Sequence, residues 1–202
     1  MAIIVDKDKK RRDIAGACTE LLLEKGIKNL TITEIARTAG IGKGTVYDYF
    51  SNKEEIVFEI IRKFIEEHQH NLLSRSDQQT STKQKVLYLF DFFLSEYKSY
   101  EKHQDVYREY LSVTLSTKSC PMLEFNSECS GFIKTILENI IAEGIKKGEI
   151  KGIAKRLVDG LIKAERGYML TAWADGKDLK QEFKDYIDTL FDLIEIKKWK
   201  KS

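Results

Sequence analysis

Side chains that can donate hydrogen bonds are closely spaced in residues 43–53. Lys43 carries an ammonium group and Thr45 a hydroxyl, and Tyr47 and Tyr49 carry hydroxyls on rigid rings. Groups of these types donate to the edges of nucleic-acid bases and to phosphate oxygens. The ordinary alternative is that the tyrosines are half-buried packing and the lysine is solvated surface. The helices that carry these residues decide between the two interpretations.

Motifs for bond-making chemistry are missing from the sequence. It has no nucleophile elbow and no phosphate-binding loop, and His68 and His70 point to different sides of a helix. Cys18, Cys120 and Cys129 are odd in number and fall at no metal-ligand spacing, so we interpret them as reduced core residues. We therefore expect no catalytic residues, no metal and no cofactor.

Composition favours an all-α fold. The 202 residues are 42% apolar and 33% charged and include a single proline, which permits long helices. The net charge is +2, but residues 1–53 carry ten Lys and Arg against seven Asp and Glu, so a mild basic excess lies near the N-terminus. No apolar run reaches the ~18 residues of a membrane span, and the start lacks a secretory signal. We expect a cytoplasmic protein with no membrane partner.

Three short helices are predicted in the first fifty residues. Apolar residues repeat with helical spacing over residues 14–22, and Gly26 follows as a helix end. Thr31 opens a capping box that starts a second helix, which ends by Gly40. Glycine permits a tight turn here into a third helix, which has Val46 on its buried face. This spacing predicts a helix-turn-helix.

The segment from Thr31 to Lys53, TITEIARTAGIGKGTVYDYFSNK, resembles the DNA-binding motif of the TetR family, also called TetR/AcrR. The resemblance covers about residues 10–65 and includes IA..AG, KGT.Y.YF and the lysine that follows. The sequence departs from the family at Gly42, where a small hydroxyl residue is frequent, and at Asp48, an acidic residue in the reading helix.

The resemblance implies that the third helix reads DNA in the major groove. Lys43 can then donate to guanine O6 and N7, Thr45 can contact a base, and Gly44 lets the backbone approach closely. Tyrosine hydroxyls and helix starts suit phosphate oxygens, whereas Asp48 can accept from cytosine N4 or pair with a basic neighbour such as Lys53. The predicted DNA-binding residues are Arg12, Thr33, Gly42, Lys43, Gly44, Thr45, Tyr47, Tyr49 and Lys53.

The remaining sequence predicts six more helices, about nine in all. A capping box at Ser51 opens a long helix that runs to about Leu73, and a polar loop follows at residues 74–82. Apolar spacing places the other helices near residues 86–97, 103–114, 121–141, 153–174 and 179–198. We expect a helix-turn-helix DNA-binding domain at residues 1–51 and a larger ligand-binding and dimerisation domain at residues 52–202.

Small residues form a seam along the helix predicted at residues 153–174, where a second backbone can approach closely. In the family that the sequence resembles, the last two helices pair with those of a second copy. A purely intramolecular core is the alternative. The predicted homodimer interface consists of Gly160, Ala164, Gly167, Thr171, Phe183, Ile187, Leu190 and Ile194.

Polar side chains interrupt the apolar stripes of the later helices. A small-molecule site is a mostly apolar cavity with a few polar groups aimed inward, although satisfied core residues explain the same pattern. Glu165 stands between apolar residues and needs a partner, which a ligand, a tyrosine hydroxyl or an arginine across the dimer can supply. The predicted lining for a small apolar or amphipathic ligand is Phe93, His103, Tyr107, Tyr110, Phe132, Glu165, Tyr168 and Met169.

The resemblance implies a sequence-specific, DNA-binding transcriptional regulator. Its simplest form is a repressor that a small-molecule ligand releases from a palindromic operator in double-stranded DNA. Two other classes are open at this stage: a helical-bundle enzyme and a sequence-independent module that binds nucleic acid or protein. Binding that collapses with salt and shows no preferred sequence would mark the nucleic-acid module.

Overall fold

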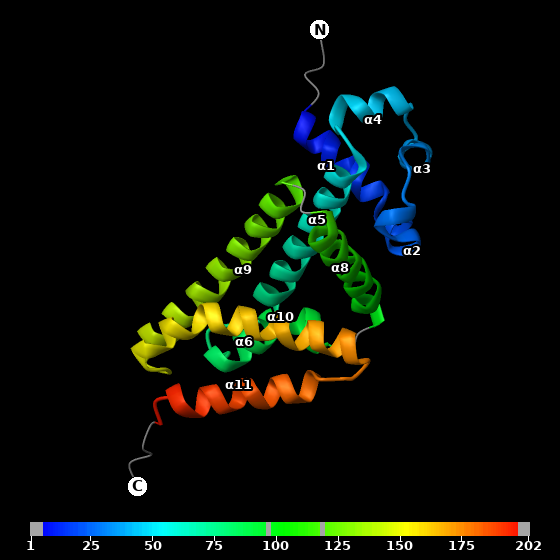
Figure 1. Cartoon of the computed structure of the whole chain (residues 1–202). Helices are drawn as coiled ribbons and strands as arrows, with labels where there is room; N and C mark the ends of the chain where they lie inside the picture. The colour runs from blue at the N-terminus through cyan, green and yellow to red at the C-terminus, as the bar shows by residue number, and fades with distance from the viewer. Residues whose placement is uncertain (1–5, 96–97, 118–119, 198–202) are drawn as a thin grey trace. The chain divides into compact units, whose positions relative to one another are not determined.

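The computed structural model describes residues 6–95, 98–117 and 120–197, and these ranges confirm the all-α prediction. The first helices are α1 (Lys7–Ala17), α2 (Thr19–Asn29), α3 (Ile32–Thr38), α4 (Lys43–Tyr49) and α5 (Lys53–Ser74) (Figure 1). The later helices are α6 (Thr82–Leu89), α7 (Asp91–Leu94), α8 (Lys98–Thr117), α9 (Cys120–Lys146), the 3-10 helix η1 (Gly152–Leu157), α10 (Val158–Asp175) and α11 (Lys180–Ile194). None of the helices in these ranges combines the length and the apolar character that crossing a bilayer requires.

The described residues form eleven α-helices and one 3-10 helix, where about nine helices were predicted. The predicted first helix is interrupted at Cys18, whose backbone N–H donates to the carbonyl of Ala15 in a tighter turn, so α1 and α2 are separate. The helix expected at residues 86–97 begins earlier and divides into α6 and α7 at Phe90, and Tyr97 lies outside the described residues.

The cysteines occupy three different environments. Cys18 is buried, as expected of a core residue, and Cys129 is half-buried. Cys120 is exposed, so the prediction that it belongs to the core is wrong. It is the first residue of α9, and a position at the very start of a helix has no preceding turn to cover it.

The chain divides into two compact units. The first unit comprises residues 1–67 and 97–126, and the second comprises residues 68–96 and 127–202. The first unit therefore contains α8 and parts of α5 and α9 besides the four N-terminal helices. The division at residue 51 into a DNA-binding domain and a ligand-binding domain concerns function, and it stays a prediction.

In the first unit, α3 and α4 form the predicted helix-turn-helix (Figure 1). Thr31 caps α3, because its hydroxyl accepts a 3.3 Å hydrogen bond from the backbone N–H of Glu34. Gly40 adopts φ 66° in the turn, a conformation that side chains with a Cβ rarely take. Val46 and Phe50 are buried and hold α4 against the core of the unit.

In the second unit, aromatic rings pack around Phe183 of α11, whose side chain is fully buried. Its ring centroid lies 5.5 Å from that of Phe90, 5.9 Å from that of Phe93 and 5.2 Å from that of Tyr168. These three rings come from the α6–α7 junction, from α7 and from α10. The core of this unit is thus built where α10, α11 and the α6–α7 segment meet.

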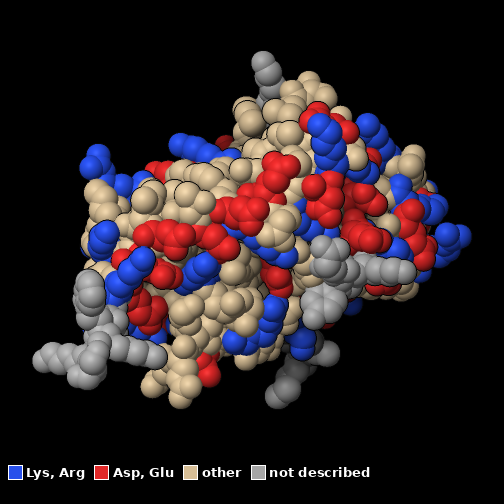
Figure 2. All heavy atoms as spheres, turned by 90° about the horizontal axis from the view of Figure 1, so that it is seen from below, with Lys and Arg blue, Asp and Glu red and all other residues tan. Residues whose placement is uncertain are grey.

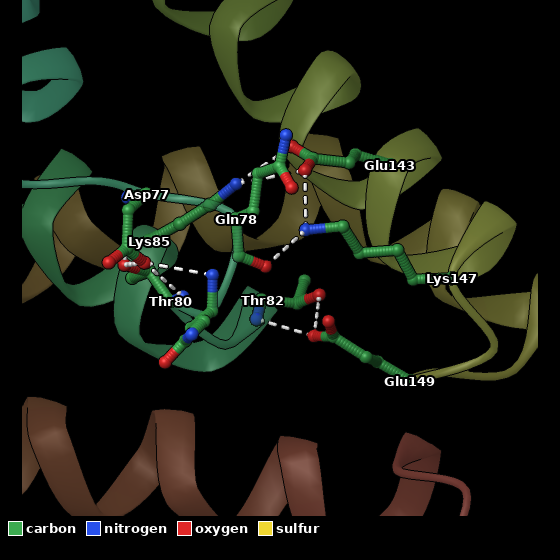
Figure 3. A network of polar contacts seen from close by, with 9 residues as sticks. Asp77, Gln78, Thr80, Thr82, Lys85, Glu143, Lys147 and Glu149 are labelled. Carbon is green, nitrogen blue, oxygen red and sulfur yellow. Dashed lines mark hydrogen bonds and ion pairs between the residues drawn. The ribbon is translucent and has the colours of Figure 1, made fainter.

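Polar contacts fix the loop before α6 to the end of α9 (Figure 3). The Glu149 carboxylate accepts from the backbone N–H of Thr82 at 2.8 Å and from its hydroxyl at 2.6 Å. Lys147 donates to the carbonyl of Gln78 at 3.1 Å and pairs with Glu143 at 2.7 Å. The polar stretch that the sequence predicts as a loop is therefore held by the side chains of Lys147 and Glu149, which lie in the turn after α9.

Candidate nucleic-acid interface

Helix α4 presents one face to solvent. Lys43, Gly44, Tyr47 and Asp48 are exposed, and Tyr47 retains 58% of its accessible surface. At about 100° per residue, these four positions cover a single arc of about 140°, which begins about 60° from buried Val46 and extends past the opposite side of the helix. A helix held by one buried face and exposed along the other can enter a DNA groove without losing its packing.

The other predicted DNA-binding residues border this face or lie nearby in the first unit. Thr45 and Tyr49 are half-buried on the sides of α4, whereas Arg12 in α1 and Thr33 in the first turn of α3 are exposed. Gly42 is the N-cap of α4 and supplies no side-chain cap to its first turn. The backbone N–H groups of that turn have no partner within their own helix and can donate to an acceptor.

Arg11, which the sequence analysis did not select, fixes the C-terminal end of α4. Its guanidinium donates to the carbonyl of Tyr49 and lies 4.5 Å from the ring centroid of Phe50. It also lies 3.5 Å from the carboxylate of Glu55 and 3.4 Å from that of Glu59, both in α5. Arg11 thus joins α1, α4 and α5. Arg11 precedes the buried residues Ile14 and Ala15 by three and four positions, and residues with this spacing share a helix face. This spacing is the signal in the sequence that could have identified Arg11.

Lys53 has a structural role in place of the predicted phosphate contact. Its ammonium lies 3.0 Å from the carbonyl oxygen of Ile27, 3.1 Å from that of Lys28 and 3.2 Å from that of Leu30. An ammonium group has three N–H donors, and these three carbonyls match them. The side chain therefore ties α5 to the segment between α2 and α3.

Glu109 of α8 holds the same segment from the other side. Its carboxylate accepts from the backbone N–H of Ile27 at 2.6 Å and from that of Lys28 at 2.8 Å. A Cβ at Gly26, where φ is 75°, would collide with this carboxylate. Glu109 and Ile27 are 82 residues apart in the sequence. A contact over this separation produces no helical spacing pattern, so the sequence alone could not predict it.

The predicted ligand residues belong to two different units. His103, Tyr107 and Tyr110 are in α8 of the first unit, and Tyr110 is a core residue whose hydroxyl donates to the carbonyl of Met122 at 3.0 Å. The second unit contains Phe93, Phe132, Glu165, Tyr168 and Met169. Phe93 and Tyr168 meet at the Phe183 ring, Met169 is a buried residue of α10, and Phe132 is exposed on α9.

Three residues of the predicted dimer interface are instead buried inside the chain. Phe183, Ile187 and Ile194 have exposed fractions of 0%, 0% and 5%, so they cannot contact a second copy. They form the core-facing stripe of α11, which has the same period as an interface stripe. The other five are not in the core: Gly160, Gly167 and Thr171 are exposed, and Ala164 and Leu190 are half-buried.

Charge is mixed on the face drawn in Figure 2. Lysine and arginine side chains alternate there with aspartate and glutamate, so this face offers no continuous basic surface to a polyanion.

A family model described as "Bacterial regulatory proteins, tetR family" matches residues 14–60, a segment that contains α3 and α4 entirely. The chain is 26% identical over 168 residues to the fatty acid metabolism regulator protein of Bacillus subtilis, with 83% of this chain and 84% of the relative covered. It is 21% identical to the HTH-type transcriptional regulator TtgR of Pseudomonas putida, with 95% and 94% of the two chains covered.

Solved structures share the fold over nearly the whole chain. A TetR transcription regulator from Haloarcula marismortui superposes with a TM-score of 0.73 at 16% identity and covers 94% of this chain and all of its own. A transcriptional regulator from Saccharomonospora viridis, solved in complex with choline, gives a TM-score of 0.70 at 16% identity and covers the same shares.

Proposed function

Because this chain belongs to the TetR family of bacterial regulatory proteins, and is a DNA-binding transcriptional regulator and not an enzyme, we propose that it is a homodimeric repressor of a palindromic operator. A small-molecule ligand releases it, and it acts in the cytoplasm. The observation that carries the proposal is the exposed face of α4, which lies in the segment matched by the family model.

In the proposed complex, α4 lies in the major groove and its first residues reach base edges. Lys43 donates to guanine, Thr45 contacts a neighbouring base, and Gly44 brings the backbone close to the DNA. Phosphate oxygens are bound by side chains and backbone groups around this face, which position the helix without reading sequence. These groups belong to Arg12, Thr33, Gly42, Tyr47 and Tyr49.

The proposed dimer uses the outward side of α10 and α11. No atom lies within 4 Å of a Cβ built at Gly160 or Gly167, so a second backbone can approach α10 closely there. Leu170 in α10 and Leu193 in α11 are large apolar residues with exposed fractions of 41% and 65%. We propose that these two leucines and Leu190 make the apolar contacts of the interface. They take the place of Phe183, Ile187 and Ile194, which are buried inside the chain. A two-fold dimer then presents two reading helices to two half-sites.

The ligand of the proposed repressor is a small apolar or amphipathic molecule. Two similar proteins support a small organic ligand: one is named a fatty acid metabolism regulator protein, in Bacillus subtilis, and the regulator from Saccharomonospora viridis was solved in complex with choline. Release requires that the ligand bind the DNA-incompetent dimer more tightly than the competent one.

Selection of bound sequences from random duplex DNA tests the proposal. The purified chain should enrich a palindromic site, and Lys43→Ala should relax the preference at one base position in each half-site. Lys102→Ala, which removes an exposed lysine of α8, is the matched control and should leave the preference unchanged. Enrichment of no sequence, with binding that disappears at moderate salt, would overturn the proposal in favour of a nonspecific module.

A further inference from the structure

Glu165 lies at the centre of the buried stripe of α10. The buried residues Val158, Leu161, Met169 and Ala172 all project within about 40° of it around the helix axis, at about 100° per residue. Glu165 is thus a carboxylate where the pattern of the helix requires an apolar side chain. Carboxylates are rarely placed in such stripes without a partner, because the charge loses its hydration.

The two flanks of α10 show what lies on either side of Glu165. On one flank, Arg166 donates to the hydroxyl of Ser130 in α9 at 3.1 Å. On the other flank, the ring of Tyr168 packs 5.2 Å from that of Phe183 in α11. Glu165 projects between these flanks, toward the interior of the second unit.

The Glu165 carboxylate has no partner among the described residues: no hydrogen bond or ion pair of theirs reaches it. Burial raises the pKa of this carboxyl to about 7, and the positive charge of the neighbouring Arg166 lowers it only in part. The side chain keeps an intermediate exposure, so it is not sealed in solid core. A positive group that reached it would stabilise its ionised form.

Tyr168 lies about one helical turn from Glu165 on α10, and its ring belongs to a group of aromatic rings. The Phe183 cluster, which we define as Phe90, Phe93, Tyr168 and Phe183, brings rings from three segments together with centroid distances of 5.2 to 5.9 Å. Aromatic faces attract organic cations, most strongly when water is excluded. A carboxylate next to such rings is the pairing that favours an alkylammonium group over a neutral or anionic one.

We propose that Glu165 and the Phe183 cluster bind the ammonium group of a cationic ligand, with Glu165 as its counter-ion. The inference deepens the proposed function, on which it rests, by naming the chemical class of the ligand. The cation pairs with the ionised carboxyl, so binding below neutral pH displaces a proton from Glu165 to solvent. The remainder of the ligand supplies the apolar body.

Calorimetric titration of the full chain with choline tests the proposal, with the neutral analogue 3,3-dimethylbutan-1-ol as its isostere. Choline should bind about tenfold more weakly at pH 6 than at pH 8, because about nine-tenths of a carboxyl with a pKa of about 7 is protonated at pH 6. The neutral analogue should bind more weakly and without this pH dependence. Benzyltrimethylammonium, a larger cation, should show the same pH dependence of binding as choline.

The isosteric variant Glu165→Gln should lose about tenfold or more of its affinity for choline and all of the pH dependence. Glu138→Gln, at an exposed carboxyl of α9 in the same unit, is the matched control and should behave as the parent chain. Equal affinity for the neutral analogue, an unaffected Glu165→Gln variant, or no binding of either cation would each overturn the cationic class.

Operator binding by the ligand-free chain separates the two proposals. If the chain selects a palindromic site but releases it only for neutral or anionic compounds, the repressor function stands and the cationic ligand is wrong. If it binds cations through Glu165 but selects no DNA sequence, the ligand site stands and the repressor function fails.

Discussion

The carboxylate of Glu109 accepts a 2.6 Å hydrogen bond from the backbone N–H of Ile27 and thereby joins α8 to the end of α2. A second bond from Lys28, at 2.8 Å, completes the pair. Glu109→Gln keeps the shape of the side chain but replaces one oxygen acceptor by an N–H donor. We expect it to lower the free energy of unfolding by about 1.5–3 kcal/mol, the range for hydrogen bonds to charged groups.

Urea unfolding of the Glu109→Gln variant measures this loss. Glu101→Gln, at an exposed carboxyl of the same helix, is the control and should change the free energy by less than about 0.5 kcal/mol. Equal stability of the two variants would contradict a structural role for the Glu109 pair.

Gly44→Ala should separate folding from DNA binding. No atom lies within 4 Å of a Cβ built at this position, and the residue has ordinary helical backbone, so alanine should stabilise the chain by about 0.4–1 kcal/mol. The same methyl group would stand between α4 and the DNA and should cost about 1–3 kcal/mol of operator binding, the size of one base contact. Thermal unfolding and fluorescence anisotropy measure the two effects.

Gly131→Ala is the control for this experiment, because Gly131 is an exposed helical glycine of α9 with equally open surroundings. It should stabilise the chain in the same way and leave operator affinity unchanged. A Gly44→Ala variant that binds as well as the parent would show that the DNA does not approach this face of α4.

Lys53→Met should weaken the fold and leave the electrostatics of DNA binding intact. The variant keeps an apolar stem but removes the donors to three carbonyls, so we expect a loss of about 1–3 kcal/mol in the free energy of unfolding. The slope of operator affinity against salt should not change, because no phosphate contact is lost. Lys63→Met, at an exposed lysine of α5, should change neither quantity measurably. If the slope of operator affinity against salt became shallower by about one, the value for one phosphate contact, Lys53 would belong to the DNA interface after all.

Glu165 should make the chain less stable as the pH rises. Its carboxyl has a folded-state pKa of about 7, above the ordinary 4.5, so the native state binds the proton more tightly than the unfolded state between these values. Stability is therefore greatest below pH 4.5 for this group and falls by up to about 3 kcal/mol toward pH 8. The partial exposure of the residue reduces that figure.

Urea unfolding at pH 5 and pH 8 checks the sign. Glu165→Gln stays neutral at both pH values, so its stability relative to the parent should rise between them. The stability of the Glu138→Gln variant should change between pH 5 and pH 8 as that of the parent chain does. A parallel change of the parent and the Glu165→Gln variant would mean that the carboxyl titrates with an ordinary pKa.

Gly167→Leu should dissociate the proposed dimer without unfolding the chain. The open space around Gly167 accommodates a side chain within one copy, whereas a second backbone packed against α10 would be forced away. Sedimentation should show a monomer with an unchanged far-ultraviolet spectrum. An intact dimer with normal operator affinity would exclude this seam from the interface.

Local signals predicted the helix-turn-helix well. The capping pair of Thr31 and Glu34 and the turn at Gly40 involve residues three or four apart, and the structure has both. By contrast, the roles of Lys53 and Glu109 depend on where α5 and α8 lie against the end of α2, which no short-range spacing contains.

The apolar stripe of α11 explains the error at the predicted interface. Phe183 and Ile187 repeat with the period that both a core-facing and a partner-facing stripe show, so the sequence could not distinguish the two. Glu165 was recognised because a charge among apolar neighbours stands out in any register. Its lack of a partner became visible only with Arg166 and Ser130 placed.

Arg11 imposes a restriction on how this protein can vary. One planar guanidinium serves a backbone carbonyl, two carboxylates and an aromatic face at once. Lysine carries the same charge but concentrates it at a point and cannot present a flat surface to Phe50 while its donors reach in several directions. Replacement of arginine by lysine is usually regarded as mild. At this position it would weaken the contacts that hold the C-terminal end of α4 against α1 and α5. Tolerance to substitution here should depend on shape and not on charge.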